Sequence, residues 1–277
     1  RDHFLGNGDD SGDRAYRATT PVAGLVFRVD PRTSLYASYG KGFETPTFVE
    51  LANRIDAGGL NFGLEASRSR HLEAGAKAVL GWARLSAALF DIATENEIVV
   101  ERNAGGRASF KNVGHTDRRG LELGAETVGT GPWEGRFAYT YLDAKYRESF
   151  VTQPLRAPGF VTVPAGSILP GVPRSVLYGE LRYRREPFFV QLEGLRKSRV
   201  AVNDANTEFA DGYFTANLVA GLVQRGAGWK ITEFVRVDNL ADKRYVGSVI
   251  VNEGNGRYYE PSPRRNMTVG LQGSLEF

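Results

Sequence analysis

The last eleven residues of the chain alternate strictly in polarity. From Met267 to Phe277, the odd positions carry Met, Val, Leu, Gly, Leu and Phe, and the even positions carry Thr, Gly, Gln, Ser and Glu. Because successive side chains of a β-strand point to opposite faces, this pattern places the apolar residues on one face. A strand of about 10 residues with one apolar and one polar face matches those that cross a bilayer in a β-barrel. The stretch therefore predicts a membrane-spanning strand.

Similar alternation, bounded by turn residues, predicts ten further strands. Together the eleven strands are expected near 18–29, 33–43, 68–80, 83–101, 107–128, 133–146, 172–185, 187–200, 212–225, 229–242 and 263–277. Alternation alone is also compatible with a soluble β-sandwich, in which two apolar faces pack together. The pattern predicts an all-β protein and leaves open whether the apolar faces of the strands contact lipid or pack together in a buried core.

The lengths of the connections between these strands favour a membrane β-barrel, in which the apolar faces contact lipid. Short connections contain Asp30-Pro31-Arg32, Gly81-Trp82, Gly129 to Trp133, Arg185-Glu186-Pro187 and Gly226-Ala227-Gly228. Long connections are expected at roughly 44–67, 102–106, 147–171, 201–211 and 243–262. Short and long connections alternate, as in antiparallel up-and-down transmembrane β-barrels, where periplasmic turns are short and external loops are long. The long connections are therefore predicted to lie outside the cell.

Composition excludes several other classes of protein. No run of about 18 apolar residues occurs, so transmembrane helices are not predicted. The 35 basic and 32 acidic residues are interspersed, which argues against nucleic-acid binding. The absence of Cys excludes disulfides and thiolate metal sites, and the three His residues form no metal-spaced pair. The sequence predicts neither a metal site nor a cofactor.

The odd number of strands predicts that this chain is part of a larger barrel. Single-chain bacterial barrels have an even number of strands, and unpaired strand edges are costly in lipid. The chain begins at Arg1 with no Met and no apolar signal region, so we expect partner strands upstream. Residues 1–277 alone are expected to aggregate or dimerise rather than insert as a monomer.

Four segments, in order, carry a family resemblance. They are Lys41-Gly42-Phe43-Glu44-Thr45-Pro46 continuing to Leu51, Asn112-Val113-Gly114 followed by Arg119-Gly120-Leu121-Glu122, Val237-Asp238-Asn239-Leu240-Ala241-Asp242-Lys243-Arg244-Tyr245, and Pro261-Ser262-Pro263-Arg264-Arg265-Asn266 before the final strand. With the terminal Phe277, this set resembles the C-terminal barrel portion of TonB-dependent outer-membrane receptors from about Pro21 onward. Ala241 departs from the bulkier residue more usual in that family.

The resemblance implies the architecture and partners of the whole protein. It implies a barrel of about 22 strands, of which residues 1–277 would be the C-terminal half, in the lipid of the bacterial outer membrane. A plug and a TonB-contacting segment (TonB box) would lie upstream and are absent from this chain. It further implies that Phe277 is the assembly signal for the barrel-insertion machinery. The implied activity is import of a scarce, bulky nutrient, most often a ferric siderophore, and not enzymatic catalysis.

Basic and aromatic residues of the predicted external loops are candidates for ligand binding. Arg107, Arg199 and Arg257, with Arg54, Arg102 and Arg147, could form an electropositive mouth for an anionic ferric chelate or a carboxylated cofactor. The alternative is that they are solvated loop charges. Tyr258 or Tyr259 could stack against a planar ligand, whereas Tyr245 is predicted to belong to the interfacial aromatic girdle.

Three alternative functions remain open at this level. The stretch from Val246 to Pro261 faintly resembles receptors for the cofactor pyrroloquinoline quinone, which implies uptake of a non-iron cofactor. A passive porin would share the barrel without tight binding. An outer-membrane hydrolase would need a base such as His115, but the nearest serine, Ser109, lies in no nucleophile-like turn. A solvated strand histidine is the preferred interpretation of His115.

Overall fold

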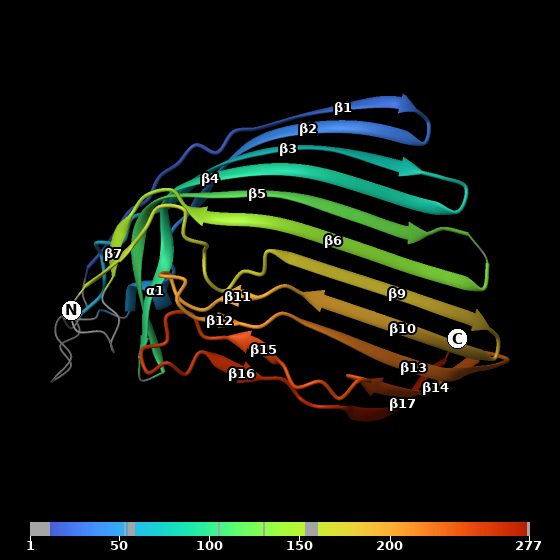
Figure 1. The fold of residues 1–277 in the computed structure, drawn as a ribbon. Helices are drawn as coiled ribbons and strands as arrows, with labels where there is room; N and C mark the ends of the chain where they lie inside the picture. The colour runs from blue at the N-terminus through green and yellow to red at the C-terminus, as the bar shows by residue number, and fades with distance from the viewer. Residues whose placement is uncertain are drawn as a thin grey trace.

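A single antiparallel sheet of eleven strands forms most of the molecule (Figure 1). The computed structural model describes residues 12–52, 54, 59–104, 106–129, 131–152 and 160–275. Each strand of the sheet pairs with the next one along the chain, so the topology is up-and-down. The strands are β1 (Val22–Asp30), β2 (Thr33–Glu44), β3 (Ser67–Val79), β4 (Ala83–Ala104), β5 (Arg107–Thr127), β6 (Trp133–Tyr146), β9 (Ser175–Arg185), β10 (Phe188–Lys197), β13 (Tyr213–Gly226), β14 (Trp229–Asp238) and β17 (Asn266–Leu275). All eleven predicted strands are confirmed.

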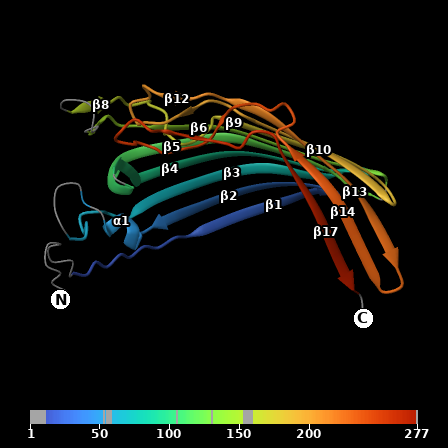
Figure 2. The same ribbon diagram turned by 90° about the horizontal axis from the view of Figure 1, so that it is seen from below.

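The sheet is strongly curved, as in the wall of a barrel (Figure 2). Its edges are β1 and β17, which do not pair with each other. The connections at one end of the strands are short, and the longer ones gather at the other end (Figure 1). This arrangement confirms the predicted barrel-type fold.

Smaller elements occupy the long connections. Helix α1 (Phe48–Ala52) follows β2, and it begins with a capping box in which the Glu50 side chain accepts a hydrogen bond from the Thr47 amide at 2.6 Å. Three two-stranded sheets pair β7 (Phe150–Thr152) with β8 (Val161–Val163), β11 (Val200–Ala201) with β12 (Phe209–Ala210), and β15 (Val246–Val249) with β16 (Tyr259–Pro261). These strands are too short to produce a readable alternation, and the sequence predicted only loops there.

Several predicted boundaries are wrong. The first strand begins at Val22 rather than 18, and the last begins at Asn266 rather than 263. β14 ends at Asp238 rather than 242, because Asn239 (φ 53°) and Asp242 (φ 52°) adopt left-handed backbone conformations that end the ladder. The predicted long connection at 102–106 is also wrong, since β4 and β5 pair as far as Ala104 opposite Arg107. The paired ends of β4 and β5 form a projecting hairpin at this position, where a long loop was predicted.

One face of the sheet carries rows of apolar residues from strand to strand. Register places five aliphatic side chains in one such row, namely Leu181, Leu192, Leu218, Val237 and Met267. Leu192 is 48% exposed and Met267 is 68% exposed, which a water-soluble sandwich would not tolerate over so wide a surface. This face is the lipid-facing, outward face. No helix in the described ranges is long and apolar enough to span a membrane.

The opposite, inward face is polar and hydrogen-bonded. Arg236 on β14 donates to Glu193 on β10 at 2.7 and 3.1 Å, and Asn217 on β13 donates to the same carboxylate at 3.2 Å. Further along the sheet, the Tyr36 hydroxyl donates to Glu73 at 2.6 Å. Several inward residues thus pair with one another across strands, and the lumen wall is polar.

Aromatic residues mark the short-turn edge of the apolar face. Trp82, Trp133, Phe188 and Trp229 all lie beside short turns and are exposed. The rings of Trp133 and Tyr183 lie 4.8 Å apart between centroids. Such rows are characteristic of the aromatic girdle at the membrane interface.

Candidate ligand-binding mouth

The buried core of the described chain lies among the external connections rather than inside the curved sheet. Its cluster consists of Val113, Ala144, Tyr146, Val163 and Leu169, each no more than 5% exposed. These residues come from the upper ends of β5 and β6, from β8 and from the connection that follows it. Burial therefore holds the external segments together as a layer above the membrane-spanning part of the sheet.

A buried polar cluster, here called the clasp, joins this layer to two further connections. The Tyr146 hydroxyl donates to Asp204 Oδ1 at 2.7 Å, and the Asn252 side-chain amide donates to Asp204 Oδ2 at 3.0 Å. The same Asn252 amide group also donates to the Val100 carbonyl oxygen on β4 at 2.6 Å. The clasp, formed by Tyr146, Asp204, Asn252 and the Val100 carbonyl, thus links four external segments.

Burial governs the chemistry of Asp204. Asp204 is only 1% exposed, and burial raises the pKa of its carboxyl group above the usual value of 3.8. The hydrogen bonds from Tyr146 and Asn252 oppose that rise by stabilising the ionised form. Asp204 therefore depends on both donors, and loss of either one weakens the connection between the external segments.

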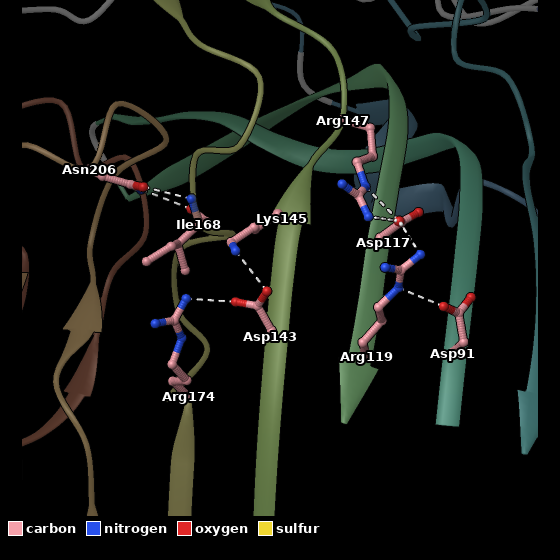
Figure 3. A network of polar contacts seen from close by, with 9 residues as sticks. All are labelled: Asp91, Asp117, Arg119, Asp143, Lys145, Arg147, Ile168, Arg174 and Asn206. Atoms are coloured by element: carbon pink, nitrogen blue, oxygen red, sulfur yellow. Dashed lines mark hydrogen bonds and ion pairs between the residues drawn. The ribbon is translucent and has the colours of Figure 1, made fainter. Parts of the chain in front are cut away.

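Additional hydrogen bonds reinforce the layer around the clasp. Asn103, near the tip of the β4–β5 hairpin, donates through its side chain to the Val251 carbonyl at 2.6 Å. Asn206 exchanges two hydrogen bonds with the backbone of Ile168, at 2.6 and 2.8 Å (Figure 3). The external segments accordingly form one connected surface around the mouth of the sheet.

A cleft of about 890 Å³ opens at this mouth, between the β12–β13 segment and the β15–β16 hairpin. Its lining combines aromatic and basic side chains: Phe209, Tyr245, Tyr259, Lys243, Arg244 and Arg264, together with Ala210, Asp211, Gly212, Val246, Pro261 and Ser262. The volume suits a small organic ligand. Aromatic faces with several basic groups fit a planar or aromatic anion better than a neutral solute.

The turn after β14 positions the basic residues of the cleft. Asn239 accepts a hydrogen bond from the Lys243 amide at 2.9 Å and donates to the Lys243 carbonyl at 2.8 Å. Asp242 accepts hydrogen bonds from the Arg265 amide at 3.1 Å and from Arg264 Nε at 3.0 Å, and these contacts lower the pKa of the Asp242 carboxyl. Arg264 is therefore neutralised locally, whereas Lys243 and Arg244 have no ion pair within the described ranges.

The predicted ligand-binding residues fall into two groups. Tyr259 lines the cleft, and its hydroxyl donates at 3.1 Å to the carbonyl oxygen of Phe209, another lining residue. Arg199 is not a lining residue, but it lies over the Phe209 ring at 4.6 Å and so adjoins the cleft. Tyr258 packs edge-on against Tyr259, with ring centroids 6.1 Å apart. Arg107 begins β5 at the projecting hairpin, outside the cleft lining.

Arg257 also lies outside the cleft lining. Its amide donates to Glu253 at 2.6 Å, and this contact lowers the pKa of the Glu253 carboxyl. Arg107 and Arg257 therefore flank the mouth, while Arg199, Tyr258 and Tyr259 belong to the cleft or adjoin it. The assignment of all five to ligand binding stays a prediction.

Comparison with known proteins identifies the family. The family model described as "TonB dependent receptor-like, beta-barrel" matches residues 1–240. The chain belongs to this family. The resemblance proposed from the four motifs is confirmed, and the members of this family are outer-membrane transport receptors rather than enzymes.

Solved receptor structures share the fold at low sequence identity. The siderophore receptor PiuA from Acinetobacter baumannii is 21% identical with a TM-score of 0.70, and the alignment covers 91% of this chain and 35% of that one. The ferric-catecholate import receptor Fiu from E. coli K12 is 21% identical with a TM-score of 0.63, covering 92% and 34%. The copper transporter OprC is 18% identical with a TM-score of 0.68, covering 93% and 39%. The chain thus spans little more than a third of these proteins.

The structure of this receptor segment adds residues that the sequence did not single out as ligand-binding. Phe209, Lys243, Arg244 and Arg264 line the cleft. Tyr245, predicted to be a girdle residue, stacks on Tyr213 at 4.3 Å and also lines the cleft. Lys243 and Arg244 fall within the motif from Val237 to Tyr245, and Arg264 falls within the motif from Pro261 to Asn266. Both motifs indicate the family and not a ligand contact, and Phe209 lies in neither.

His115 and Phe277 are two further residues to which the sequence analysis gave a possible role. His115 Nδ1 lies 2.5 Å from Glu148 and its Nε2 lies 3.7 Å from Glu95, while the Ser109 hydroxyl donates to the Arg102 carbonyl. His115 is an exposed strand residue whose ring contacts two carboxylates, and the Ser109 hydroxyl is bonded to the Arg102 carbonyl instead of to His115, so these two residues do not form the nucleophile–base pair that a serine hydrolase requires. Among the described residues, no group of His, Asp or Glu could hold a metal ion. Phe277 lies outside the described residues.

Proposed function

We propose that this chain is the C-terminal half of the barrel of a TonB-dependent receptor in the bacterial outer membrane. The receptor would take up a ferric siderophore, with a plug and a TonB-contacting segment contributed by upstream sequence. Phe277 would act as the signal for barrel assembly. The proposal is supported by the family match over residues 1–240, and its central observation is the aromatic and basic cleft at the mouth.

The chemistry of the cleft supports an anionic, partly aromatic ligand. Lys243 and Arg244 supply positive charge without a carboxylate partner among the residues that the structure describes, so an incoming anion would not have to displace an ion pair from this part of the chain. Tyr245 and Tyr259 offer flat surfaces for stacking. Arg199 beside Phe209 extends the positive surface toward β10. Ferric chelates with aromatic, acidic donor groups combine these two properties.

Growth rescue tests this function. A strain that lacks the receptor would be supplied with the full-length gene and grown with individual ferric siderophores as the sole iron source. We expect rescue by at least one aromatic siderophore, and loss of tight binding in a Lys243→Gln, Arg244→Gln double variant. Arg32→Gln, at a short turn on the opposite end of the barrel, is the matched control and should bind normally. Unchanged affinity in the double variant would contradict the assignment of the cleft.

The same experiment separates the alternatives. Rescue only on pyrroloquinoline quinone would replace the siderophore with that cofactor, which is also anionic and planar. Rescue only on copper would place the receptor functionally with proteins such as the copper transporter OprC. A passive porin would conduct ions as the intact protein in planar bilayers, whereas a plugged receptor would not. Family membership favours the gated receptor.

A further inference from the structure

A second, smaller hollow adjoins the cleft at the mouth. It has a volume of about 350 Å³ and lies between the external end of β10, strand β11, and β15 with the residues that follow it as far as Val251. Ala210, Asp211 and Val246 line both the hollow and the cleft, so the two spaces meet. The short strands around the hollow lie beyond the external ends of β10 and β13 (Figure 1). A ligand that occupies the cleft can therefore extend into the hollow.

The apolar lining of the hollow is mainly aliphatic. It contains four half-buried valines, Val200, Val246, Val249 and Val251. The cleft, by contrast, is lined by three aromatic side chains, those of Phe209, Tyr245 and Tyr259. An aliphatic wall buries a hydrocarbon segment of any shape, whereas flat rings favour a flat partner. The two spaces are thus suited to different parts of one ligand.

Lys197 is the only basic side chain among the described residues that line the hollow. It is half-buried, and within the described ranges its ammonium group has neither an ion pair nor a hydrogen bond. Partial burial of an ammonium group without a partner costs free energy, and an anionic ligand group would offset that cost through a charge-assisted hydrogen bond. The hollow therefore fits an aliphatic segment that carries an acidic group.

Asp211 separates Lys197 from the basic residues of the cleft. It lines both spaces, is exposed, and has no basic partner in the part of the chain that the structure describes. Its carboxylate would repel an anionic ligand group at the junction, whereas an N–H group could donate a hydrogen bond to it. The part of the ligand that lies at the junction should therefore be uncharged.

Hydrogen bonds hold both walls of the hollow in place. On one side, Lys197 belongs to the ladder of β10, which is paired with β9 and with β13. On the other side, the Val251 carbonyl accepts a hydrogen bond from the Asn103 side chain at 2.6 Å, and the next residue, Asn252, belongs to the clasp. Because these walls are fixed without a ligand, little ordering of the protein is needed on binding.

We propose that the hollow is a second ligand subsite, in which Lys197 binds the acidic end of an aliphatic arm while the cleft binds the aromatic part of the same ligand. This subsite rests on the proposed function of the cleft. It narrows the ligand to a class with three parts: an anionic aromatic head, an uncharged amide linker beside Asp211, and an aliphatic arm that ends in a carboxylate. Val246 and Val249 contact the hydrocarbon of the arm.

Binding of three ferric catechol amides to the purified full-length receptor tests the subsite. The first probe carries an aminocaproic acid arm on its amide, the second carries the same arm ending in a neutral carboxamide, and the third has no arm. The unmodified receptor should bind the acidic-arm probe about tenfold more tightly than the neutral-arm probe, as expected for one hydrogen bond between charged groups. Lys197→Gln should remove this preference and leave the affinity for the armless probe unchanged.

Two further variants complete the experiment. Lys230→Gln is the matched control, because Lys230 is a half-buried lysine at the short-turn end of β14 and lies outside both linings. It should keep the preference for the acidic arm. Val249→Phe adds a ring to the aliphatic wall, so it should weaken binding of both armed probes and leave the armless probe unaffected. Retained binding of the armless probe also shows that each variant is folded.

The outcomes separate the subsite from the cleft. Loss of the acidic-arm preference in Lys197→Gln but not in Lys230→Gln supports the subsite. Equal binding of the acidic-arm and neutral-arm probes by the unmodified receptor overturns it, and so does a preference that survives Lys197→Gln. If the armless probe binds and its binding depends on Lys243 and Arg244, the proposed function of the cleft stands even where the subsite fails. Binding of none of the three probes overturns both.

Discussion

Removal of a single oxygen atom from the clasp should loosen the external layer without unfolding the barrel. In Tyr146→Phe, the ring and its packing against Phe150, at 4.8 Å between centroids, can be retained. The hydrogen bond to Asp204 at 2.7 Å is lost. Because both residues are 1% exposed, water does not replace the missing donor in the closed state.

The expected magnitude follows from the charge of the acceptor. A hydrogen bond to a charged group contributes about 1.5–3 kcal/mol. A loss of about 2 kcal/mol raises the equilibrium constant for local opening about thirtyfold, since about 1.4 kcal/mol corresponds to a factor of ten. Loss of the Tyr146 donor also raises the pKa of Asp204 further, because only the Asn252 hydrogen bond and the charge of Lys111 then remain to stabilise the ionised carboxyl.

Amide hydrogen exchange on the full-length receptor measures this opening. The reporters are the Asn252 amide, which donates to the Val202 carbonyl, and the Val202 amide, which donates to the Glu208 carbonyl. Both should exchange about thirtyfold faster in Tyr146→Phe under conditions in which exchange reports the opening equilibrium.

Tyr141→Phe is the matched control for this experiment. Tyr141 lies on the same strand, faces the lipid and is 39% exposed, so loss of its hydroxyl should leave both reporters unchanged. If Tyr146→Phe also leaves both amides within twofold of their original rates, the clasp does not hold the layer closed. The reasoning from burial and hydrogen bonding would then be refuted.

Three further predictions concern pH, lipid exposure and the open edges. The pKa of Glu253 is lowered mainly by the hydrogen bond from the Arg257 amide, so this contact stabilises the turn above pH 4.5 and is lost as the pH falls below that value. Hydrogen exchange of the Arg257 amide should therefore accelerate at the lower pH, and Glu253→Gln should abolish this pH dependence. Glu233 faces lipid between Leu222 and Leu271, so Glu233→Leu should stabilise the barrel by about 1 kcal/mol in a denaturant titration, whereas Glu193→Leu on the inward face should destabilise it. The 277-residue chain alone should aggregate or dimerise in vesicles, because β1 and β17 leave unpaired edges; clean monomeric insertion on cross-linking would contradict this.

The strands were predictable because lipid imposes a simple rule on them. Each strand that crosses the apolar layer must alternate, and the register of the sheet then aligns Leu181 with Leu192 and Val237 with Met267. The predicted strand ends were less accurate beyond the apolar layer, where side chains no longer have to alternate. The final residues of β14 gave way to a left-handed turn at Asn239, and the β4–β5 hairpin continued beyond its expected end.

The candidate site was predictable only in part, because its residues come from separate connections. The sequence selected Arg199, Tyr258 and Tyr259 by charge, aromaticity and position in a long loop. It had no means to pair Tyr146 with Asp204, which are 58 residues apart, or Val100 with Asn252, which are 152 apart. Such contacts depend on the packing of irregular segments, which carry no periodic signal.

The sequence by itself determined that this chain forms a curved, membrane-facing antiparallel sheet of the TonB-dependent receptor family. Alternation with a period of two decides that outcome strand by strand, because each residue must face either lipid or lumen. Only the tertiary structure decided which external residues meet. Burial of Asp204 among three connections and the contact of Asn252 with the Val100 carbonyl are properties of spatial proximity. They follow from strand register and loop packing, and no local pattern in the sequence encodes them.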